Sequence, residues 1–437
     1  MNELKLINTE NCKCGKPHRL SVDSIIIGSG VIKKLPDTVK KYGAKKAFVI
    51  SDKNTYKAAG EKVCALLDEC DIAYTSYSFD QDSLEPNETN VGLAVMYFDK
   101  ECDIVIGVGS GVINDIGKIL SSLSSKPYII VATAPSMDGY ASATSSMTRE
   151  ALKISIPSKS ADVIIGDTDI LRNAPTDMMR AGLGDMIAKY VSICEWRISH
   201  LITGEYYCES IAELIRNALA QCAELAPKLM ERDEKAVAAV FKGLVLSGLA
   251  MNFAGLSRPA SGVEHYFSHL WDMRGAVFGT PVSLHGVQCA IGTLLAIKIY
   301  ENLKKTTPNR EKAIEYVEKF DLKSWNAKLR EFLGKGAESM IELEKTEKKY
   351  CPLSHRTRLE IIIKNWDNIL KIIDEELPPY DKVKALIESI GSPVSVNEIG
   401  LDDSILPMSF KATKDIRNKY VLSRLAWDLG IIEEIEV

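Results

Sequence analysis

Short apolar runs alternate with amphipathic segments between residues 45 and 133. Strands are predicted where β-branched and aromatic residues are concentrated, at 46–50, 72–77, 103–108 and 128–132. Helix-compatible spacing of apolar residues lies between these runs, at 56–67, 90–98 and 113–123. Strands that alternate with helices are typical of a parallel sheet with crossover helices. We therefore predict a doubly wound, nucleotide-binding topology for this part of the chain.

The pattern changes after about residue 145. Two more strands, 152–157 and 163–167, are expected to close the first domain. From Ala174-Pro175 onward the 3.6-residue period of helices dominates, and strand signals almost vanish. The prediction is a Rossmann-like α/β domain over residues 1–173, followed by an all-α domain over residues 174–437.

Composition narrows the function only slightly. The 437 residues are 46% hydrophobic and carry a formal charge of -5. This mild acidity argues against a broad nucleic-acid interface, so no nucleic-acid partner is expected. No apolar stretch is expected to reach the length of roughly 18 residues that a membrane span needs. Residues 1–19 are too polar for a signal peptide. We therefore expect a cytoplasmic protein with no membrane span.

The ten cysteines are too dispersed for a disulfide scaffold, and most are expected to be small core residues. Cys12, Cys14 and His18 are the exception, because two thiols and an imidazole within seven residues can in principle bind zinc. A second cysteine pair of this kind is absent, so a simple turn is the favoured interpretation.

Three of the six histidines lie within 21 residues, which indicates a metal site. His265 and His269 are four residues apart and share one face of a helix, and His285 can approach them from a following helix. Asp185, after Gly182-Leu183-Gly184, opens an apolar helical pattern and can complete an Asp/His/His ligand set. The alternative is that these histidines are ordinary core or surface residues.

Two further segments carry candidate chemistry. Gly109 and Gly111 follow a strong strand and open a helix, where backbone amides can bind a pyrophosphate; the alternative is a tight packing turn. Residues 133–142 (TAPSMDGYAS) follow the next strand, and their small hydroxyl residues suit cofactor contacts. Asp138 within them can accept a hydrogen bond from a substrate hydroxyl or form an Asp-Gly turn. Asp52 can bind an adenosine ribose or cap the next helix.

Together these motifs resemble the sn-glycerol-1-phosphate dehydrogenase family, a relative of glycerol dehydrogenases, iron-containing alcohol dehydrogenases and dehydroquinate synthases. The resemblance runs from about Cys12 to beyond His285 and is carried by GVGSGVIND, TAPSMDGYAS, AGLGD, GVEHYFSH and SLHG. TAPSMDGYAS is the most specific piece. The region from about residue 306 to 437 carries no motif that contributes.

The resemblance implies a dehydroquinate synthase-like fold and a role for each motif. It implies that Asp185, His265 and His285 are metal ligands, with Asp185 also touching substrate. It also implies that His269 contacts the substrate and is not a metal ligand. Asp138 is a second implied substrate contact. The implied cofactor contacts are Asp52, Gly109, Ser110, Gly111, Val112, Ile113, Asn114, Asp115, Thr133, Ala134, Pro135, Ser136 and Ser142.

The implied reaction is hydride transfer between NAD or NADP and C2, interconverting dihydroxyacetone phosphate and sn-glycerol 1-phosphate with the help of zinc, nickel or iron. Asp52 favours NAD, whereas Lys53 can accommodate NADP. Arg258 and Lys189 are candidate phosphate ligands or structural groups. The resemblance further implies a homodimer and a role in phospholipid synthesis or in catabolism. The alternatives are a polyol dehydrogenase, a dehydroquinate-synthase-like cyclase and an inactive nucleotide-binding protein.

Overall fold

The computed structural model describes residues 10–149 and 152–437, which form two compact units. The first unit contains residues up to 186 together with 213–256, and the second contains 187–212 together with 257–437. The units therefore divide at a different place from residue 173, because helix α8 (Thr176–Ile187) lies almost entirely in the first unit and α11 (Glu234–Ala254) lies wholly in it.

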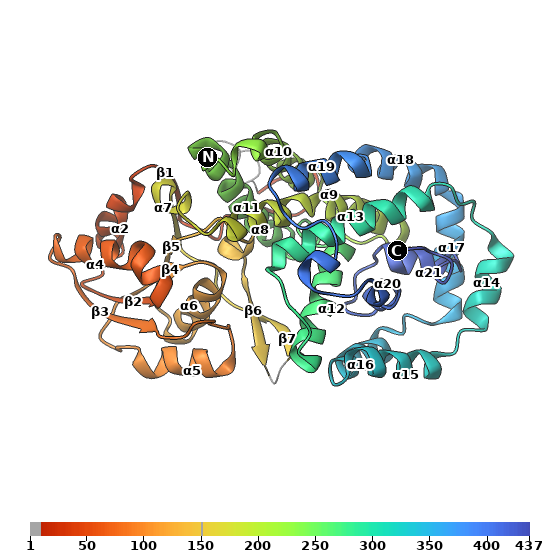
Figure 1. The fold of residues 1–437 in the computed structure, drawn as a ribbon, viewed down its shortest axis with the longest axis horizontal. Coiled ribbons are helices and arrows are strands. Elements are labelled where there is room, and N and C mark those ends of the chain that lie inside the picture. The colour runs from red at the N-terminus through yellow and green to blue at the C-terminus, as the bar shows by residue number, and fades with distance from the viewer. Residues whose placement is uncertain (1–9, 150–151) are drawn as a thin grey trace. The chain divides into compact units, whose positions relative to one another are not determined.

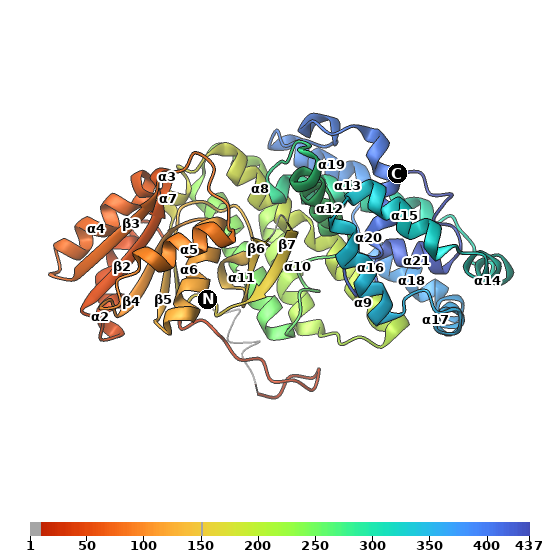
Figure 2. The same ribbon diagram turned by 90° about the horizontal axis from the view of Figure 1, so that it is seen from below.

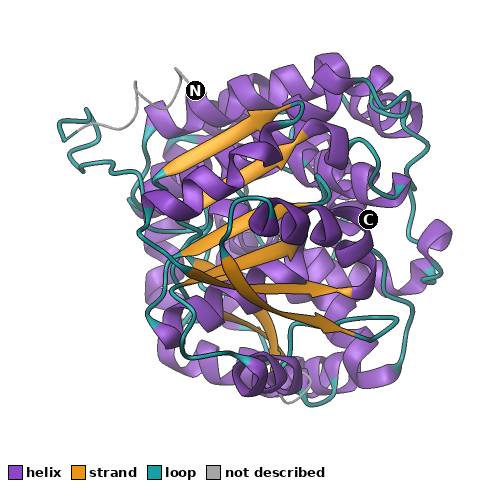
Figure 3. Cartoon of the chain, turned by 90° about the vertical axis from the view of Figure 1, so that its left-hand side faces the viewer, coloured by secondary structure: helices purple, strands orange, loops and turns teal. Residues whose placement is uncertain are grey.

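A six-stranded parallel sheet forms the centre of the first unit, in the order β1-β8-β5-β4-β2-β3 (Figures 1 and 3). Its strands are β1 (Ser24–Gly28), β2 (Lys46–Asp52), β3 (Ala73–Phe79), β4 (Ile104–Gly109), β5 (Tyr128–Ala132) and β8 (Val163–Asp167). The central strands β4, β5 and β8 are buried along their whole length, as near-continuous apolar runs in a parallel sheet require. The predicted α/β fold is confirmed.

Helices cover this sheet and join its strands (Figure 2). They are α2 (Leu35–Lys41), α3 (Lys53–Thr55), α4 (Glu61–Asp68), α5 (Glu88–Tyr97), α6 (Gly111–Ser124) and α7 (Thr168–Leu171), with short turns η1 (Val31–Lys34), η2 (Tyr56–Gly60) and η3 (Gly139–Ala141). A further turn of the first unit, η4 (Ala226–Lys228), comes directly before the segment that leads to α11. Apolar residues of α2 and α4 pack with those of β2, β4 and β5 in one hydrophobic core. The first predicted helix is split, because its first turn is the π-type turn η2.

The predicted strand at 152–157 exists but does not close the main sheet. It is β7 (Leu152–Pro157), which pairs antiparallel with β6 (Thr144–Arg149) in a separate two-stranded sheet. The prediction missed β6 because its sequence, TSSMTR, contains one apolar residue. It also missed β1, whose SIIIG run precedes the region where the alternation is clear.

Helix α11 corrects the prediction that no apolar stretch reaches the length of a membrane span. Among the described residues it is the one helix that is long and apolar enough by length and composition. Most of its apolar stretch is buried, and it contacts η3, α7 and β1 of its own unit. This is the environment of a core helix in a folded domain.

The second unit is helical throughout the part that the structure describes, which confirms the all-α prediction. Its helices are α9 (Lys189–Thr203), α12 (Val263–Phe278), α13 (His285–Leu303), α14 (Arg310–Glu318), α15 (Leu322–Leu333), α16 (Gly336–Glu347), α17 (Pro352–Lys364), α18 (Trp366–Glu376), α19 (Tyr380–Ser389), α20 (Leu406–Thr413) and α21 (Leu422–Asp428), with turns η5 (Asn397–Ile399) and η6 (Asp403–Ile405). Helix α10 (Glu209–Leu225) contributes residues to both units. A Cβ on Gly292 of α13 would lie 2.5 Å from the Glu264 carbonyl oxygen of α12, so these two helices meet backbone to backbone.

Candidate active site

The carboxyl ends of two neighbouring strands, β4 and β5, bring two predicted cofactor segments to one edge of the sheet. Gly109 at the end of β4 is in register with Ala132 at the end of β5. The Thr133 amide donates a hydrogen bond to the Gly109 carbonyl, with an N–O distance of 3.1 Å. The Ser110 and Ser136 hydroxyls also bond to each other. The two predicted cofactor segments are therefore adjacent, at the position where open α/β sheets bind ligands.

The beginning of helix α6 has the features of a phosphate-binding turn. Its N-cap residue, Ser110, makes no side-chain capping bond, so capping does not use the amides of the first turn. Those amides and the helix dipole favour an anion. A Cβ on Gly109 would lie 2.5 Å from Ile113 Cβ, so the glycine is also needed for the sharp turn from strand to helix. The donors present fit the pyrophosphate of a dinucleotide.

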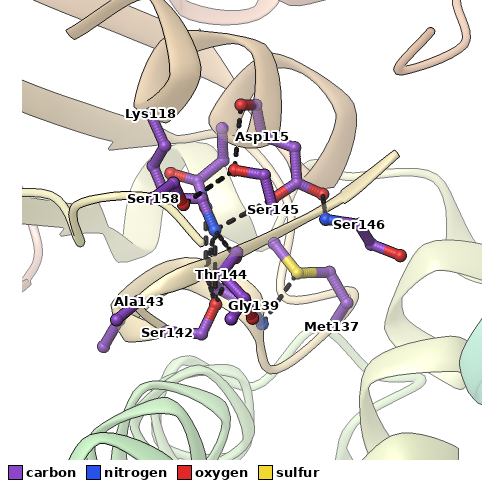
Figure 4. Close-up of polar contacts among 12 residues, drawn as sticks. Asp115, Lys118, Met137, Gly139, Ser142, Ala143, Thr144, Ser145, Ser146 and Ser158 are labelled. Carbon is purple, nitrogen blue, oxygen red and sulfur yellow. Dashed lines mark hydrogen bonds and ion pairs between the residues drawn. The ribbon is translucent and has the colours of Figure 1, made fainter. Parts of the chain in front are cut away.

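Lys118 of α6 is a fully buried lysine that the sequence analysis missed, and it binds the TAPSMDGYAS loop from inside (Figure 4). Its Nζ donates to the Gly139 carbonyl at 3.3 Å, to Ser142 Oγ at 3.2 Å and to the Thr144 carbonyl at 2.5 Å. It also pairs with the Asp115 carboxylate at 2.9 Å. The sequence contains a signal for this ion pair, because Lys118 follows Asp115 by three residues within an otherwise apolar helix.

The same network engages side chains that were predicted to contact the cofactor. Asn114 Nδ2 donates to the Gly139 carbonyl at 3.0 Å, and the Asp115 carboxylate accepts the Ser146 amide at 3.2 Å. Ser142 Oγ donates to the Thr144 carbonyl at 2.9 Å. These contacts position the loop within the protein, and direct cofactor contact by the three residues stays a prediction.

Replacing Lys118 with methionine is expected to lower the free energy of unfolding by about 3 kcal/mol, because it leaves the Asp115 carboxylate and two buried carbonyls without their cation. We also expect weaker NAD(P)H binding, since the loop loses its anchor. Denaturant titration and a fluorescence measurement of cofactor affinity test both effects. Lys62→Met, at an exposed position of α4, is the matched control, with an expected change below about 0.5 kcal/mol. An equal effect of the two substitutions would contradict the anchoring role.

Asp138 and Asp185, both in the first unit, lie side by side. Asp185 is fully buried in α8, and its Oδ2 accepts the Asp138 backbone amide at 3.0 Å. The Asp138 carboxylate in turn accepts Ser247 Oγ of α11 at 2.8 Å. Two carboxylates from distant parts of the sequence are thus positioned by one short chain of hydrogen bonds.

Close backbone contacts hold this loop in place. A Cβ on Gly182 of α8 would lie 1.8 Å from the Pro135 carbonyl oxygen, and a Cβ on Gly248 of α11 would lie 2.8 Å from the Asp138 carbonyl oxygen. Only glycine permits such approaches. The glycine at the start of the AGLGD motif is therefore explained by contact with the TAPSMDGYAS loop.

Asp52 at the end of β2 caps the following helix, which is the second of its two predicted roles. Its Oδ1 accepts the amides of Asn54 and Thr55 at 2.8 and 2.9 Å, and Thr55 Oγ1 accepts the Asp52 amide at 3.0 Å. This reciprocal capping box leaves ribose binding as a prediction. The neighbouring Lys53 forms an ion pair with the exposed Asp82.

The second unit gathers the three histidines of the predicted metal site. His265 and His269 project from α12, and His285 is the first residue of α13. The ring centroids of His265 and His285 are 5.1 Å apart, and those of His269 and His285 are 5.7 Å apart. Candidate ligand atoms of His265, His285 and Cys289 lie within 4.8 Å of one another, as do those of His269, Asp272 and His285. The histidines therefore cluster as predicted.

Two of these imidazoles are oriented through the same ring nitrogen. His265 Nδ1 bonds the Glu264 carboxylate at 2.8 Å, and His285 Nδ1 bonds Ser268 Oγ at 3.0 Å. A metal on either ring would therefore be bound by Nε2. Metal-ligating histidines characteristically have their other nitrogen held in this way. The donor set fits a divalent transition metal.

Cys289 is a candidate ligand that the sequence analysis did not recognise. It follows His285 by four residues on α13, the same spacing that joins His265 to His269. Burial raises the pKa of its thiol, but His265 and His285 act in the opposite direction and lower the pKa overall. Cys289 Sγ lies 3.6 Å from His285 Nε2. A nearby soft donor increases the preference of the cluster for zinc-like metals.

The Glu264–His265 bond supports a prediction about metal affinity. Glu264→Ala is expected to weaken metal binding by about 10- to 100-fold, because His265 loses the partner that orients and polarises its ring. Glu264→Gln retains a hydrogen-bond acceptor and should recover part of the affinity. Competition with a chelating dye measures both. Equal affinity of wild type and Glu264→Ala would show that this carboxylate does not support the metal.

The two basic residues considered for phosphate binding are engaged by the protein. Arg258 is buried and donates to Glu205 at 2.7 Å, the Tyr420 carbonyl at 2.8 Å and Ser199 Oγ at 3.0 Å. Lys189 is also buried and donates to the Ala260 carbonyl at 3.0 Å. Their contacts correspond to the structural interpretation that the sequence left open.

Two features are typical of metal-dependent dehydrogenases. One is a glycine turn at the carboxyl edge of a parallel sheet, and the other is a cluster of oriented imidazoles. Residues 26–175 match the family model described as iron-containing alcohol dehydrogenase. The solved structure of a probable glycerol dehydrogenase from Sinorhizobium meliloti has a TM-score of 0.62 and 16% sequence identity, over 94% of this chain and 97% of that one.

The names of curated relatives define the family more narrowly than the family model does. Glycerol-1-phosphate dehydrogenase [NAD(P)+] of Halalkalibacterium halodurans is 28% identical over 97% of this chain and 96% of its own length. The protein of the same name from Bacillus licheniformis is 32% identical over 67% of this chain and 74% of its own length. The chain belongs to the glycerol-1-phosphate dehydrogenase family, and the resemblance inferred from its motifs is confirmed.

Proposed function

We propose that this protein is a glycerol-1-phosphate dehydrogenase that reversibly reduces dihydroxyacetone phosphate at C2 to sn-glycerol 1-phosphate with NADH or NADPH. The observation that carries the proposal is the histidine cluster with two Nδ1-oriented rings, in a chain of this family. NAD(P)H supplies the hydride. The glycine turn and the bonded Ser110–Ser136 pair supply the groups that fit its pyrophosphate.

Asp185, His265 and His285 are the proposed metal ligands. Zinc or nickel is the expected ion, with iron as the alternative, because imidazole accepts all three. A divalent ion held by these residues supplies Lewis-acid stabilisation of negative charge on the C2 oxygen. Glu264 and Ser268 keep the two rings in the orientation for binding, and the Asp138 amide orients the Asp185 carboxylate.

Asp138 and His269 are the proposed substrate contacts. The Asp138 carboxylate has Ser247 as its fixed partner and can accept a hydrogen bond from a substrate hydroxyl. Burial, followed by the neighbouring His285 and His265, lowers the pKa of His269 well below its ordinary value. The ring is therefore neutral near pH 7. Such a ring can accept a proton at one nitrogen and donate a proton from the other.

Lys419 and Arg417 replace Arg258 and Lys189 as the proposed phosphate ligands. Both are among the charges that lower the pKa of His269, and the Lys419 ammonium lies 5.9 Å from the centre of the Tyr266 ring on α12, which supports the proposal. Lys419 Nζ donates to Ser261 Oγ at 2.6 Å and to the Ser261 carbonyl at 2.8 Å, just before α12 begins. Both residues lie in the region where the sequence analysis found no motif.

Lys419→Gln should raise the KM for dihydroxyacetone phosphate by about 10- to 100-fold, because a charge-assisted hydrogen bond to phosphate is lost. Turnover of unphosphorylated dihydroxyacetone, where measurable, should stay within about twofold of wild type. Steady-state kinetics with both substrates makes the comparison. A parallel loss on both substrates would assign Lys419 a structural role instead.

The proposed reaction is tested by following NADH and NADPH oxidation with dihydroxyacetone phosphate, after separate reconstitution with zinc and nickel. Chiral analysis of the product should give sn-glycerol 1-phosphate. Turnover of glycerol or another polyol without dihydroxyacetone phosphate reduction would favour a polyol dehydrogenase. A product without net NADH change would favour a cyclase. The same preparation tests for the proposed homodimer by light scattering, and fractionation of cells tests for the proposed cytoplasmic location.

A further inference from the structure

We propose that Cys12, Cys14 and His18 bind a structural zinc ion, separate from the catalytic metal. Candidate ligand atoms of these three residues lie within 4.8 Å of one another. Cys14 Sγ lies 3.3 Å from His18 Nε2, on a segment only seven residues long. The sequence interpretation of a simple turn therefore omits the convergence of three potential zinc donors.

The local backbone brings the two thiols to the same place. The Gly15 amide donates to the Cys12 carbonyl at 2.9 Å, which closes a tight turn around Cys14. Gly15 has a φ of +83°, in the left-handed region that favours glycine. The turn that the sequence predicted is therefore present, and it arranges the cysteines as neighbouring ligands.

His18 provides an independent indication of a metal ligand. Its side chain is fully buried, and Nδ1 lies 3.2 Å from the Phe253 carbonyl oxygen of α11. A carbonyl only accepts, so Nδ1 carries a hydrogen, and Nε2 is the nitrogen through which the ring can bind a metal. That nitrogen is the one beside Cys14 Sγ. A backbone carbonyl on the other ring nitrogen is a common arrangement for zinc-ligating histidines.

The donor chemistry selects the ion. Two cysteine sulfurs and one imidazole nitrogen are donors that suit zinc, whereas magnesium and calcium prefer oxygen ligands. Zinc in a structural site takes four ligands, so a further protein group or water completes the coordination. Through His18 the ion would fasten the segment before β1 to α11, the same helix that positions Asp138 through Ser247.

The test is the metal content of the purified full-length protein, measured by mass spectrometry of the elements. Cys12→Ser/Cys14→Ser is expected to lose about one zinc per chain relative to wild type, and to be more sensitive to heat. His285→Ala should retain this zinc while losing the catalytic metal. Cys70→Ser is the matched control, because Cys70 is a partly buried cysteine outside the cluster, and it should retain the wild-type zinc content.

Thiol alkylation of the wild-type protein tests the same site without a substitution. Cys12 and Cys14 should be protected in the zinc-loaded protein and become reactive after chelation, whereas the reactivity of Cys70 should change little. Unchanged zinc content in the double serine variant, or alkylation of Cys12 and Cys14 that ignores chelation, would overturn the proposal. Neither result depends on the identity of the substrate.

Discussion

His285→Ala is expected to abolish catalytic metal binding and to reduce NAD(P)H-dependent reduction of dihydroxyacetone phosphate by about a thousandfold. The substitution removes one of the two imidazoles that the protein orients through Nδ1. Loss of Lewis-acid stabilisation costs several kcal/mol in the transition state, and about 4 kcal/mol corresponds to this reduction in rate. Metal analysis and steady-state kinetics on the same sample provide the measurement.

The fold should survive this substitution, because the site is at the first residue of α13 rather than along its buried length. Circular dichroism and the melting temperature of the metal-free wild type provide the reference. His200→Ala, at an exposed histidine near the end of α9, is the matched control and should retain both metal and activity. A His285→Ala protein with full metal content and turnover would refute the ligand assignment.

Gly182→Ala is expected to reduce activity by at least about a hundredfold through the backbone alone. The added methyl group would lie 1.8 Å from the Pro135 carbonyl oxygen, so α8 or the TAPSMDGYAS loop has to move. Either movement displaces Asp138 relative to Asp185, whose hydrogen bond is 3.0 Å long. A misplacement of about 1 Å at a catalytic group can cost about a hundredfold in rate.

The matched control is Gly92→Ala within α5. A Cβ at Gly92 has no heavy atom within 4 Å, and alanine is favoured over glycine inside a helix by about 1 kcal/mol. This variant should be as stable as wild type or slightly more so, with unchanged kinetics. Comparison of kcat, KM and thermal unfolding for the two variants distinguishes a local clash from a general effect of alanine. Wild-type activity in Gly182→Ala would show that the loop tolerates displacement.

The sheet was predictable because its strands are short, apolar and separated by helical periods. Residues 46–50 and 128–132 are recognised by this contrast, and they form β2 and β5. The strand at 144–149 was not recognised, because a two-stranded antiparallel pair with polar side chains lacks the continuous apolar run of a buried strand. The partner of β7 is the strand directly before it in the sequence, so the missing signal was the weak apolar pattern of β6 itself.

The candidate site was predictable to the extent that its residues occur in compact motifs. His265, His269 and His285 are close in sequence and cluster in the structure. Lys118 escaped notice because its burial depends on carbonyls contributed by a loop more than twenty residues later. Lys419 is 158 residues from its partner Ser261, so no local pattern relates the two. Long-range contacts, rather than motifs, determine these assignments.

The attachment of the TAPSMDGYAS loop has a consequence for redesign of coenzyme preference. This loop carries proposed cofactor contacts and Asp138 on one short segment that glycine contacts and Lys118 hold rigidly. Substitutions there would alter coenzyme choice and substrate geometry together. Asp52 and Lys53, at the end of β2, contact their own helix turn and Asp82 instead. We therefore expect substitutions at the β2 terminus to change the proposed ribose contact without moving Asp138, so this terminus is the better place to seek an exchange of NADH for NADPH.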